Sequence, residues 1–426
     1  MIKVSSVNNS LLLTFKKPNM WQWMMAFYVL YTFMAILGQF MNYASVFIFI
    51  FILFCAVKNR GRIVKRPVAF VWCLWILIYP ILDNFLRGEY KLQLYELLSY
   101  GTVILFLIFA DDDVNNVKGL LTGFKIIAWF NVFGILLQNL IPRLHTIIAW
   151  RLLGTWLYNI TAFTSDATMA AFIFAVGIGI AFAEMISSDR RNSKLIKIVE
   201  IIVLSERLIM TTKRLLLVAT VAMILIEWLI ISSNSFQKFF KTLLLEFLIL
   251  IVLLVIFLFS YFILDSENAF GRLGETIVGY FNGEDVSNMR SVWAELMNEW
   301  RQDNVWFGIG WESFRNRIII AGHKGVPNGH NVYMQIMCEE GYFGLIVFIV
   351  LLLYSLVVSF KCGRFYLENG NYVEKKLTYS ALSIFIIFVI YMATGNGIYD
   401  SSIYLFFFAA ILILALLNYN RRKHVR

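Results

Sequence analysis

The segment YMQIMCEEGYFGLIVFIVLLLYSLVVSF, residues 333–360, decides the fold class because it is almost wholly apolar. A helix that crosses the hydrocarbon core of a bilayer needs roughly 20 apolar residues. Eleven further segments have the same character: 24–40, 43–57, 68–82, 97–110, 119–141, 166–186, 195–210, 214–232, 243–264, 377–393 and 402–418. The sequence therefore predicts an all-α polytopic membrane protein with about 12 transmembrane helices.

The composition agrees with a membrane protein. Of the 426 residues 60% are hydrophobic and 15% are charged, whereas a soluble domain is about 25% charged. A polar and basic start without a small-residue cleavage site predicts that the first apolar run is a retained signal anchor. The four cysteines have no CxxC or CxxH spacing. Neither a metal site, nor a cofactor, nor a disulfide framework is therefore expected.

The net charge of +10 is explained by the predicted topology. With the N-terminus inside, 23 Lys and Arg residues fall on the inner side and 7 in the short outer connections. Lys and Arg are enriched in cytoplasmic loops of membrane proteins. Both termini are therefore predicted to be cytoplasmic, and the basic charge gives no reason to expect a nucleic-acid partner.

One predicted connection is much longer than the others. Residues 265–332 form an outer loop of 68 residues, whereas helix–helix connections usually have about 2–8. The chain thus divides into 1–264 with nine spans, this extracytoplasmic loop, and 333–426 with three spans and a basic cytoplasmic tail. Within the loop, Asn288–Arg301 is predicted as an amphipathic helix, and such a helix can lie in the membrane interface with its tryptophans at headgroup depth.

Several cations gather on the predicted outer face, where positive charge is disfavoured. They are Arg151, Arg207, Lys213, Arg214, Arg290 and Arg301. Guanidinium groups bind phosphate through two parallel hydrogen bonds, so a pyrophosphate-linked lipid is a plausible ligand. The alternative is that each cation extends toward lipid phosphates. The chain has no Walker, GxGxxG, HExxH or GxSxG motif, so the donor of an enzymatic reaction must already be activated.

His330 is the strongest candidate for acid–base chemistry. It stands at the outer mouth of the apolar segment 333–360, on a helix expected to begin near Gly329. Histidine acts as a general base near neutral pH, but a helix-capping or lipid-facing histidine is the open alternative. The run Asp111–Asp113 and Asp166 each precede a predicted helix, which favours capping over metal or sugar binding.

The segment HNVYMQIMCEEGYFG, His330 to Gly344, resembles the H-N-x-Y-x-Q-x(3)-E-x-G-x-x-G signature of the O-antigen ligase and Wzy-type polysaccharide polymerase family. The matching positions are His330, Asn331, Tyr333, Gln335, Glu339, Gly341 and Gly344. Weaker matches lie at Arg290 with Trp293, Gly308–Gly310 with Phe314, Thr212–Leu215 and Arg151–Gly154. The specific motifs cover 206–344, and elsewhere the similarity is one of topology.

The resemblance implies a GT-C-like fold and a metal-independent, inverting glycosyltransferase at the outer face of a bacterial inner (cytoplasmic) membrane. Its donor and acceptor would be polyprenyl-pyrophosphate-linked oligosaccharides, with membrane lipids, a flippase and a chain-length regulator as further partners. Arg214 and Arg290 would bind pyrophosphate, and His330 would orient or deprotonate the acceptor hydroxyl. The expected substrate-binding residues are Arg151, Arg207, Lys213, Arg301, Asn331, Tyr333, Gln335 and Glu339.

Three functions stay open at this point. A polymerase is favoured, because the resemblance is diffuse outside the loop, as expected when each enzyme suits its own glycan. A ligase would pass the glycan to lipid A-core or another acceptor instead. A transporter of lipid-linked glycan would also use cations for pyrophosphate, but its charges should line a path across the membrane.

Overall fold

The computed structural model describes residues 19–37, 41–58, 67–87, 94–110, 113–153, 161–164, 166–232, 237–248, 251, 274, 278–279, 281–282, 290–322 and 328–425. All regular secondary structure in these ranges is helical. The helices are α1 (Met20–Leu37), α2 (Met41–Lys58), α3 (Pro67–Cys73), the π-helix η1 (Leu74–Ile78), α4 (Tyr79–Arg87), α5 (Leu94–Phe109), α6 (Val114–Leu140), α7 (Pro142–Leu153), α8 (Ala167–Ser187), α9 (Arg191–Met210), α10 (Arg214–Ser232), α13 (Arg290–Arg301), α14 (Ser313–Ile320), α15 (Val332–Glu339), α16 (Gly341–Asn369), α17 (Tyr372–Tyr391), the 3₁₀ turn η2 (Gly397–Tyr399) and α18 (Ser401–Val425).

Seven of the described helical segments are long and apolar enough to cross a membrane. They are Met20–Leu37, Pro67–Arg87, Val114–Leu140, Ala167–Ser187, Arg214–Ser232, Gly341–Asn369 and Ser402–His424. The prediction of an all-helical polytopic membrane protein is therefore confirmed. The apolar parts of α2 and α5 are shorter, while α9 and α17 carry several charges in their first turns. The total of about 12 spans and the division at 264 and 332 stay predictions, and most of 243–264 lies outside the described residues.

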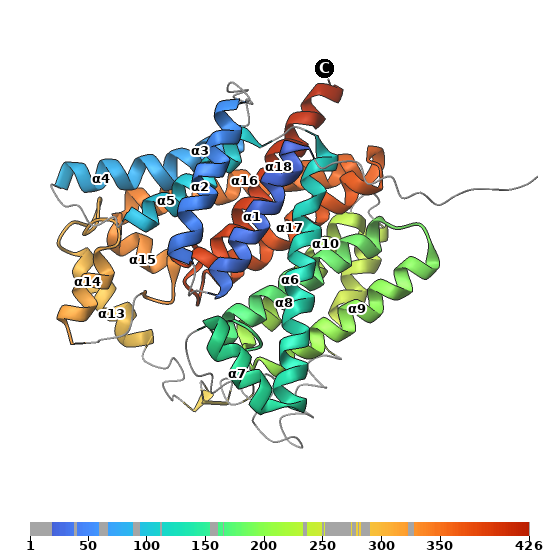
Figure 1. Ribbon diagram of the computed structural model, residues 1–426, viewed down its shortest axis with the longest axis horizontal. Helices are drawn as coiled ribbons and strands as arrows, with labels where there is room; N and C mark the ends of the chain where they lie inside the picture. Colours follow the sequence, from blue (N-terminus) through green and yellow to red (C-terminus); the bar gives the residue numbers. More distant parts are fainter. Residues whose placement is uncertain are drawn as a thin grey trace, which may run out of the picture.

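Helices α8 and α18 form the centre of the bundle. The apolar windows of these two helices are 89% and 94% buried. Helix α8 contacts α6, α9, α10 and α17, and α18 contacts α1, α16 and α17 (Figure 1). Because apolar side chains cover almost their whole circumference, these helices have no polar face to expose.

The span predicted at 333–360 exists from Gly341 onward, but its first residues form the separate helix α15, because the helix is interrupted at Glu340 and Gly341. Helix α15 ends at Glu339, and α16 begins at Gly341. The backbone of Gly341 has a φ of +67°, and a Cβ placed there would lie 2.3 Å from the carbonyl carbon of Trp306. Only glycine combines this left-handed conformation with so close an approach of another backbone.

The segment that approaches this turn, 305–310, pairs with it along the backbone. The amide of Ile309 donates to the carbonyl of Cys338 at 3.0 Å, and that of Gly310 to the carbonyl of Glu339 at 2.7 Å. In the other direction, Tyr342 donates to Val305 at 3.1 Å. These bonds satisfy backbone groups that the break between α15 and α16 would otherwise leave without partners.

The end of α4 holds the same segment from the other side. Arg87 donates to the carbonyl oxygens of Phe307 at 2.7 Å and Gly308 at 3.2 Å. Its guanidinium also forms an ion pair with Asp83 at 2.7 Å, and the second oxygen of Asp83 accepts from the amide of Trp311 at 2.9 Å. The segment is therefore fixed between two helices far apart in sequence.

The amphipathic helix predicted at 288–301 exists as α13, from Arg290 to Arg301. Its apolar face packs against the protein, and a position of the helix in the membrane interface stays a prediction. That face, formed by Trp293, Leu296, Met297 and Trp300, covers Ile309, Phe314, Ile318 and Cys338. Figure 1 shows α13, α14 and α15 together at one edge of the molecule, away from the C-terminal end of α18.

Replacing Gly341 by alanine should destabilise the docking of 305–310. A left-handed alanine costs about 1 kcal/mol, and the added Cβ overlaps the Trp306 carbonyl. We expect a lower melting temperature and faster proteolysis within 305–311 for Gly341→Ala in purified protein. Gly119→Ala is the matched control, because a Cβ at Gly119 meets nothing within 4 Å. Equal melting temperatures for both variants would contradict this account of the turn.

Candidate functional site

His330 occupies a strained turn immediately before α15. Its φ is +52°, a left-handed conformation that is uncommon for residues other than glycine, although histidine is among the side chains enriched in it. The sequence predicts that the helix begins near Gly329, but it begins after His330, because Asn331 is its N-cap. The Asn331 side-chain oxygen accepts from the amide of Met334 at 3.1 Å, and the first helical residue is Val332. Strained backbone of this kind is concentrated at functional sites.

Backbone bonds on both sides of His330 fix the turn. The amide of Gly329 donates to the side-chain oxygen of Gln335 at 2.9 Å. The amide of Val332 donates to the carbonyl oxygen of Met392, just after α17, at 2.9 Å. The imidazole is therefore carried by a turn whose two neighbouring amides are anchored to different helices.

Glu339 connects this turn with the rest of the loop. Its fully buried carboxylate accepts from the amide of Phe314 at 3.1 Å, from Tyr399 at 2.8 Å and from the amide nitrogen of Gln335 at 3.3 Å. Burial raises the pKa of Glu339 to about 7, although these hydrogen bonds oppose the shift. The bonds of Glu339 and Gln335 lie within the protein, so the geometry favours a positioning role, and direct substrate contact by either stays a prediction.

The imidazole of His330 lies against the first turn of α13. It stacks on Trp293 with ring centroids 5.2 Å apart and planes 28° from parallel. Burial lowers the pKa of His330 below its usual 6.5, and the positive charges of Arg290 and Lys213 lower it further, while Asp166 opposes them. The structure thus brings two predicted cations to the predicted histidine. Because its pKa lies below 6.5, the imidazole is mainly neutral at pH 7 and able to accept a proton.

Asp166, whose charge acts on His330, has a second carboxylate, Asp400, in its own surroundings. Asp166 caps α8, as predicted, by accepting from the amides of Thr168 at 2.5 Å and Met169 at 3.1 Å. Asp400 lies before α18, and burial raises its pKa to about 6, with the charge of Asp166 adding to the shift. The sequence alone did not single out Asp400. The one feature that could have indicated it is its position two residues before an apolar span.

The other predicted cations differ in their surroundings. Arg207 pairs with Glu206 at 2.9 Å. Arg301 donates to Asn298 at 2.7 Å and to the hydroxyl of Tyr342, whose ring it also faces at 4.9 Å. These contacts hold both guanidinium groups within the protein, and phosphate binding by them stays a prediction.

Three further predicted residues have clear positions. Arg214 is half-buried at the start of α10, directly after Lys213, and Arg151 is exposed near the end of α7. The hydroxyl of Tyr333 donates to the carbonyl of Val389 in α17 at 2.9 Å. Tyr333 therefore contributes to the attachment of α15 to α17, and its contact with substrate stays a prediction.

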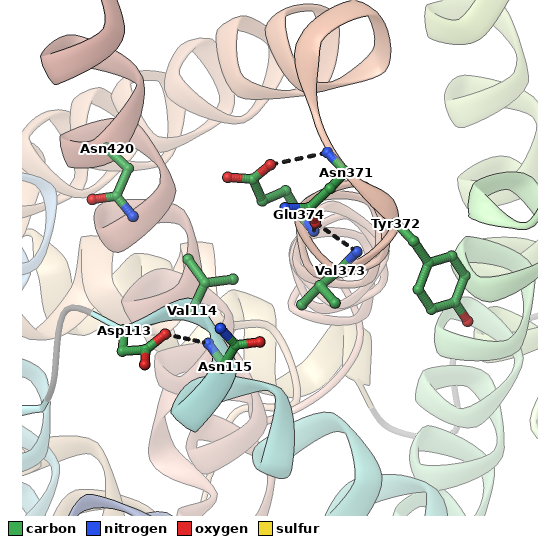
Figure 2. A pocket seen from close by; sticks show the side chains of 8 residues that line it. All are labelled: Asp113, Val114, Asn115, Asn371, Tyr372, Val373, Glu374 and Asn420. Carbon is green, nitrogen blue, oxygen red and sulfur yellow. Dashed lines mark hydrogen bonds between the residues drawn. The ribbon is translucent and has the colours of Figure 1, made fainter.

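A separate cavity of about 390 Å³ lies at the N-terminal ends of α6 and α17 (Figure 2). Asp113 accepts from the amide of Asn115 at 2.8 Å, which confirms its predicted capping role, and Asn371 caps α17 in the same way. Asp111 and Asp112 lie outside the described residues. Among the described residues, no group of three or more His, Cys, Asp or Glu side chains could hold a metal ion.

The fold and site define a multi-pass membrane protein in which a histidine with a lowered pKa stacks on Trp293 and feels the charges of Arg290 and Lys213. Residues 201–349 match the model of the O-Antigen ligase family, a range that includes Lys213, Arg214, Arg290 and His330. The match confirms the resemblance to this family and supports a glycosyltransferase-like ligase or polymerase activity on lipid-linked glycans. None of the curated proteins is significantly similar to the chain.

The electrostatic environment of His330 can be measured through its reactivity. Diethyl pyrocarbonate modifies only neutral imidazole, so its pH dependence, followed by mass spectrometry, reports the pKa. We expect a midpoint below 6.5 for His330, moved upward by Arg290→Gln and downward by Asp166→Asn. The modification profile of His424, in the exposed tail, should not change in either variant. Identical His330 midpoints in all three proteins would show that these charges do not act on it.

Proposed function

We propose that the chain is an inverting glycosyltransferase that polymerises polyprenyl-pyrophosphate-linked oligosaccharide repeat units into a cell-surface polysaccharide at the outer face of the cytoplasmic membrane. The observation that supports this most is the environment of His330, which stacks on Trp293 and whose pKa is lowered by burial and then by Arg290 and Lys213. An imidazole beside two cations suits a reaction in which a hydroxyl loses a proton while a phosphate gains negative charge.

The cations would act on the donor. As the bond between the sugar C1 and the pyrophosphate oxygen breaks, the bonding pair stays with that oxygen, and negative charge grows on the leaving group. Arg290 and Lys213, with Arg214 directly after Lys213, are the groups proposed to stabilise this charge. Preorganised cations act without reorganisation during the reaction, so their contribution falls on the transition state and not only on binding.

His330 would act on the acceptor. The acceptor hydroxyl oxygen forms the new bond to C1 from the face opposite the pyrophosphate, which inverts the configuration, and its proton passes to the neutral imidazole. The products are the lengthened glycan and polyprenyl pyrophosphate. Donor binding would neutralise the charges of Arg290 and Lys213 and thereby raise the basicity of His330 when the acceptor reacts.

A positioning role for His330 is the alternative within this mechanism. Pyrophosphate leaves readily, so the acceptor needs less help from a base than in the transfer of poorer leaving groups. In that case His330 would orient the acceptor hydroxyl by a hydrogen bond without accepting its proton, and a side chain with similar hydrogen-bonding capacity could replace it.

A ligase reaction would use the same donor chemistry with a different acceptor, lipid A-core or another molecule. We favour polymerisation because the specific motifs lie within 206–344, while the remainder resembles the family in topology, as expected for enzymes suited to individual glycans. A transporter is less well supported. In the described residues, the charged groups of Lys125, Glu184 and Glu200 bond to one another instead of continuing the cation group beside His330.

Removing the proposed catalytic groups should shorten the polysaccharide. His330→Ala should reduce turnover by about 10²–10⁴-fold, and Arg214→Ala or Arg290→Ala by about 10²-fold or more, judged from polymer-length gels at equal expression. Arg317→Ala is the control, since this cation of the same loop pairs with Asp303. Normal long chains in all three variants would refute a catalytic role, and His330→Gln with long chains would support positioning over proton transfer.

The same gels separate the possible acceptors. A single repeat unit on the final acceptor in the inactive variants would support polymerisation. Long chains that stay on the carrier lipid, with no transfer to the final acceptor, would support ligation.

The proposed side of the membrane can be tested by cysteine labelling. The four natural cysteines are buried, so an impermeant maleimide should react only with introduced cysteines. We expect Gln302→Cys to be labelled in intact spheroplasts and Asn192→Cys only after permeabilisation, because the charge count puts these exposed residues on opposite sides. The reverse pattern would place the site around His330 inside the cell.

A further inference from the structure

Five charged side chains from four helices form a network at the end of the bundle where the basic connections gather. Glu184 of α8 pairs with Lys125 of α6 at 2.7 Å, Lys197 of α9 at 2.8 Å and Lys376 of α17 at 2.5 Å. Glu200 of α9 pairs with Lys125 at 2.8 Å and Lys197 at 3.0 Å. Three ammonium groups thus face two carboxylates, which leaves the network with a surplus of positive charge.

An open groove of about 700 Å³ lies directly beside this network, between α6 and α9, two helices in contact (Figure 1). Ile126 and Trp129 of α6 form one wall, and Ile196 and Val199 of α9 form the other. These side chains are between 42% and 64% exposed. The indole nitrogen of Trp129 donates to Glu200 at 3.1 Å, so the ring is held flat against the polar end of the groove.

The groove continues into a second hollow of about 620 Å³ that has a cationic lining. Arg190, Arg191, Asn192 and Ser193 line it, and it shares Ile196 and Lys197 with the groove. Both arginines are exposed, and neither has an ion pair within the described residues. The apolar groove and the cationic hollow are therefore continuous through the two residues that they share.

We propose that this groove binds an anionic phospholipid of the leaflet that contains the basic connections. The acyl chain would lie along Ile126 and Ile196, and the phosphate would reach Arg190 and Arg191. The apolar walls belong to a helix long enough to span the membrane and to α9 beside it, so the groove opens toward lipid. The charge surplus is complementary to an anionic headgroup and not to a zwitterionic one.

The occupant matters because it would connect helices that carry the outer site. Helix α9 ends one turn before Lys213, and α17 ends beside Met392, which holds the His330 turn. A lipid wedged between α6 and α9 would stabilise the arrangement of both ends of α9 through the ion-pair network. The site is distinct from the proposed glycan site and does not depend on that proposal.

Native mass spectrometry of the full chain in detergent tests the site with phosphatidylglycerol and phosphatidylcholine as probes. Each Lys or Arg near an anionic headgroup strengthens binding about fivefold. The double variant Arg190→Gln with Arg191→Gln should therefore bind phosphatidylglycerol about 25-fold more weakly. The double variant Lys361→Gln with Arg364→Gln removes the same charge from exposed positions of α16 and should bind as the unchanged protein does.

A second pair of variants tests the apolar wall. Ile196→Gln should weaken phosphatidylglycerol binding, while Ile198→Gln, exposed on the same helix but outside the groove, should not. Melting temperatures in the absence of added lipid establish that all four variants are folded. Equal binding of the two lipids, or equal losses in the groove variants and their controls, would overturn the proposal.

Discussion

The buried carboxylate of Glu339 is the point on which the arrangement of α13, α14 and α15 depends. A carboxylate removed from water must be hydrogen-bonded to be tolerated, and three of its donors come from α14, α15 and the turn before α18. Gln335, one of the three, also holds the amide next to His330. The position of the His330 imidazole therefore depends on the hydrogen bonds that the buried Glu339 carboxylate accepts.

The residues that match the family signature have different structural roles. Asn331 ends the turn as a helix cap, Gln335 and Glu339 form the internal polar chain, and Gly341 permits contact between backbones. His330 is the motif residue whose pKa is lowered, by burial and in addition by the charges of Arg290 and Lys213. Most residues of such a motif thus keep one side chain in place, and several of them have no need to contact a substrate.

Features set by local sequence could be predicted, and features set by distant contacts could not. The apolar segments gave helices near their expected limits, and Asp113 and Asp166 cap as expected, because both effects depend on neighbouring residues. The break at Glu340 and Gly341 requires the segment 305–310, and the inward face of α13 requires the apolar surface of α14 and α15. The proximity of Asp400 to Asp166 likewise arises only when the ends of α8 and α18 meet.

Under the proposed function, the left-handed backbone of His330 sets activity against folding at one position. Glycine would adopt this φ at less cost than histidine. Selection for backbone stability alone would not require an imidazole here, whereas selection for the proposed chemistry would. Chains that have acquired glycine at this position should accumulate in the membrane at least as well as the active form, so cellular protein level is a poor guide to function in this part of the molecule.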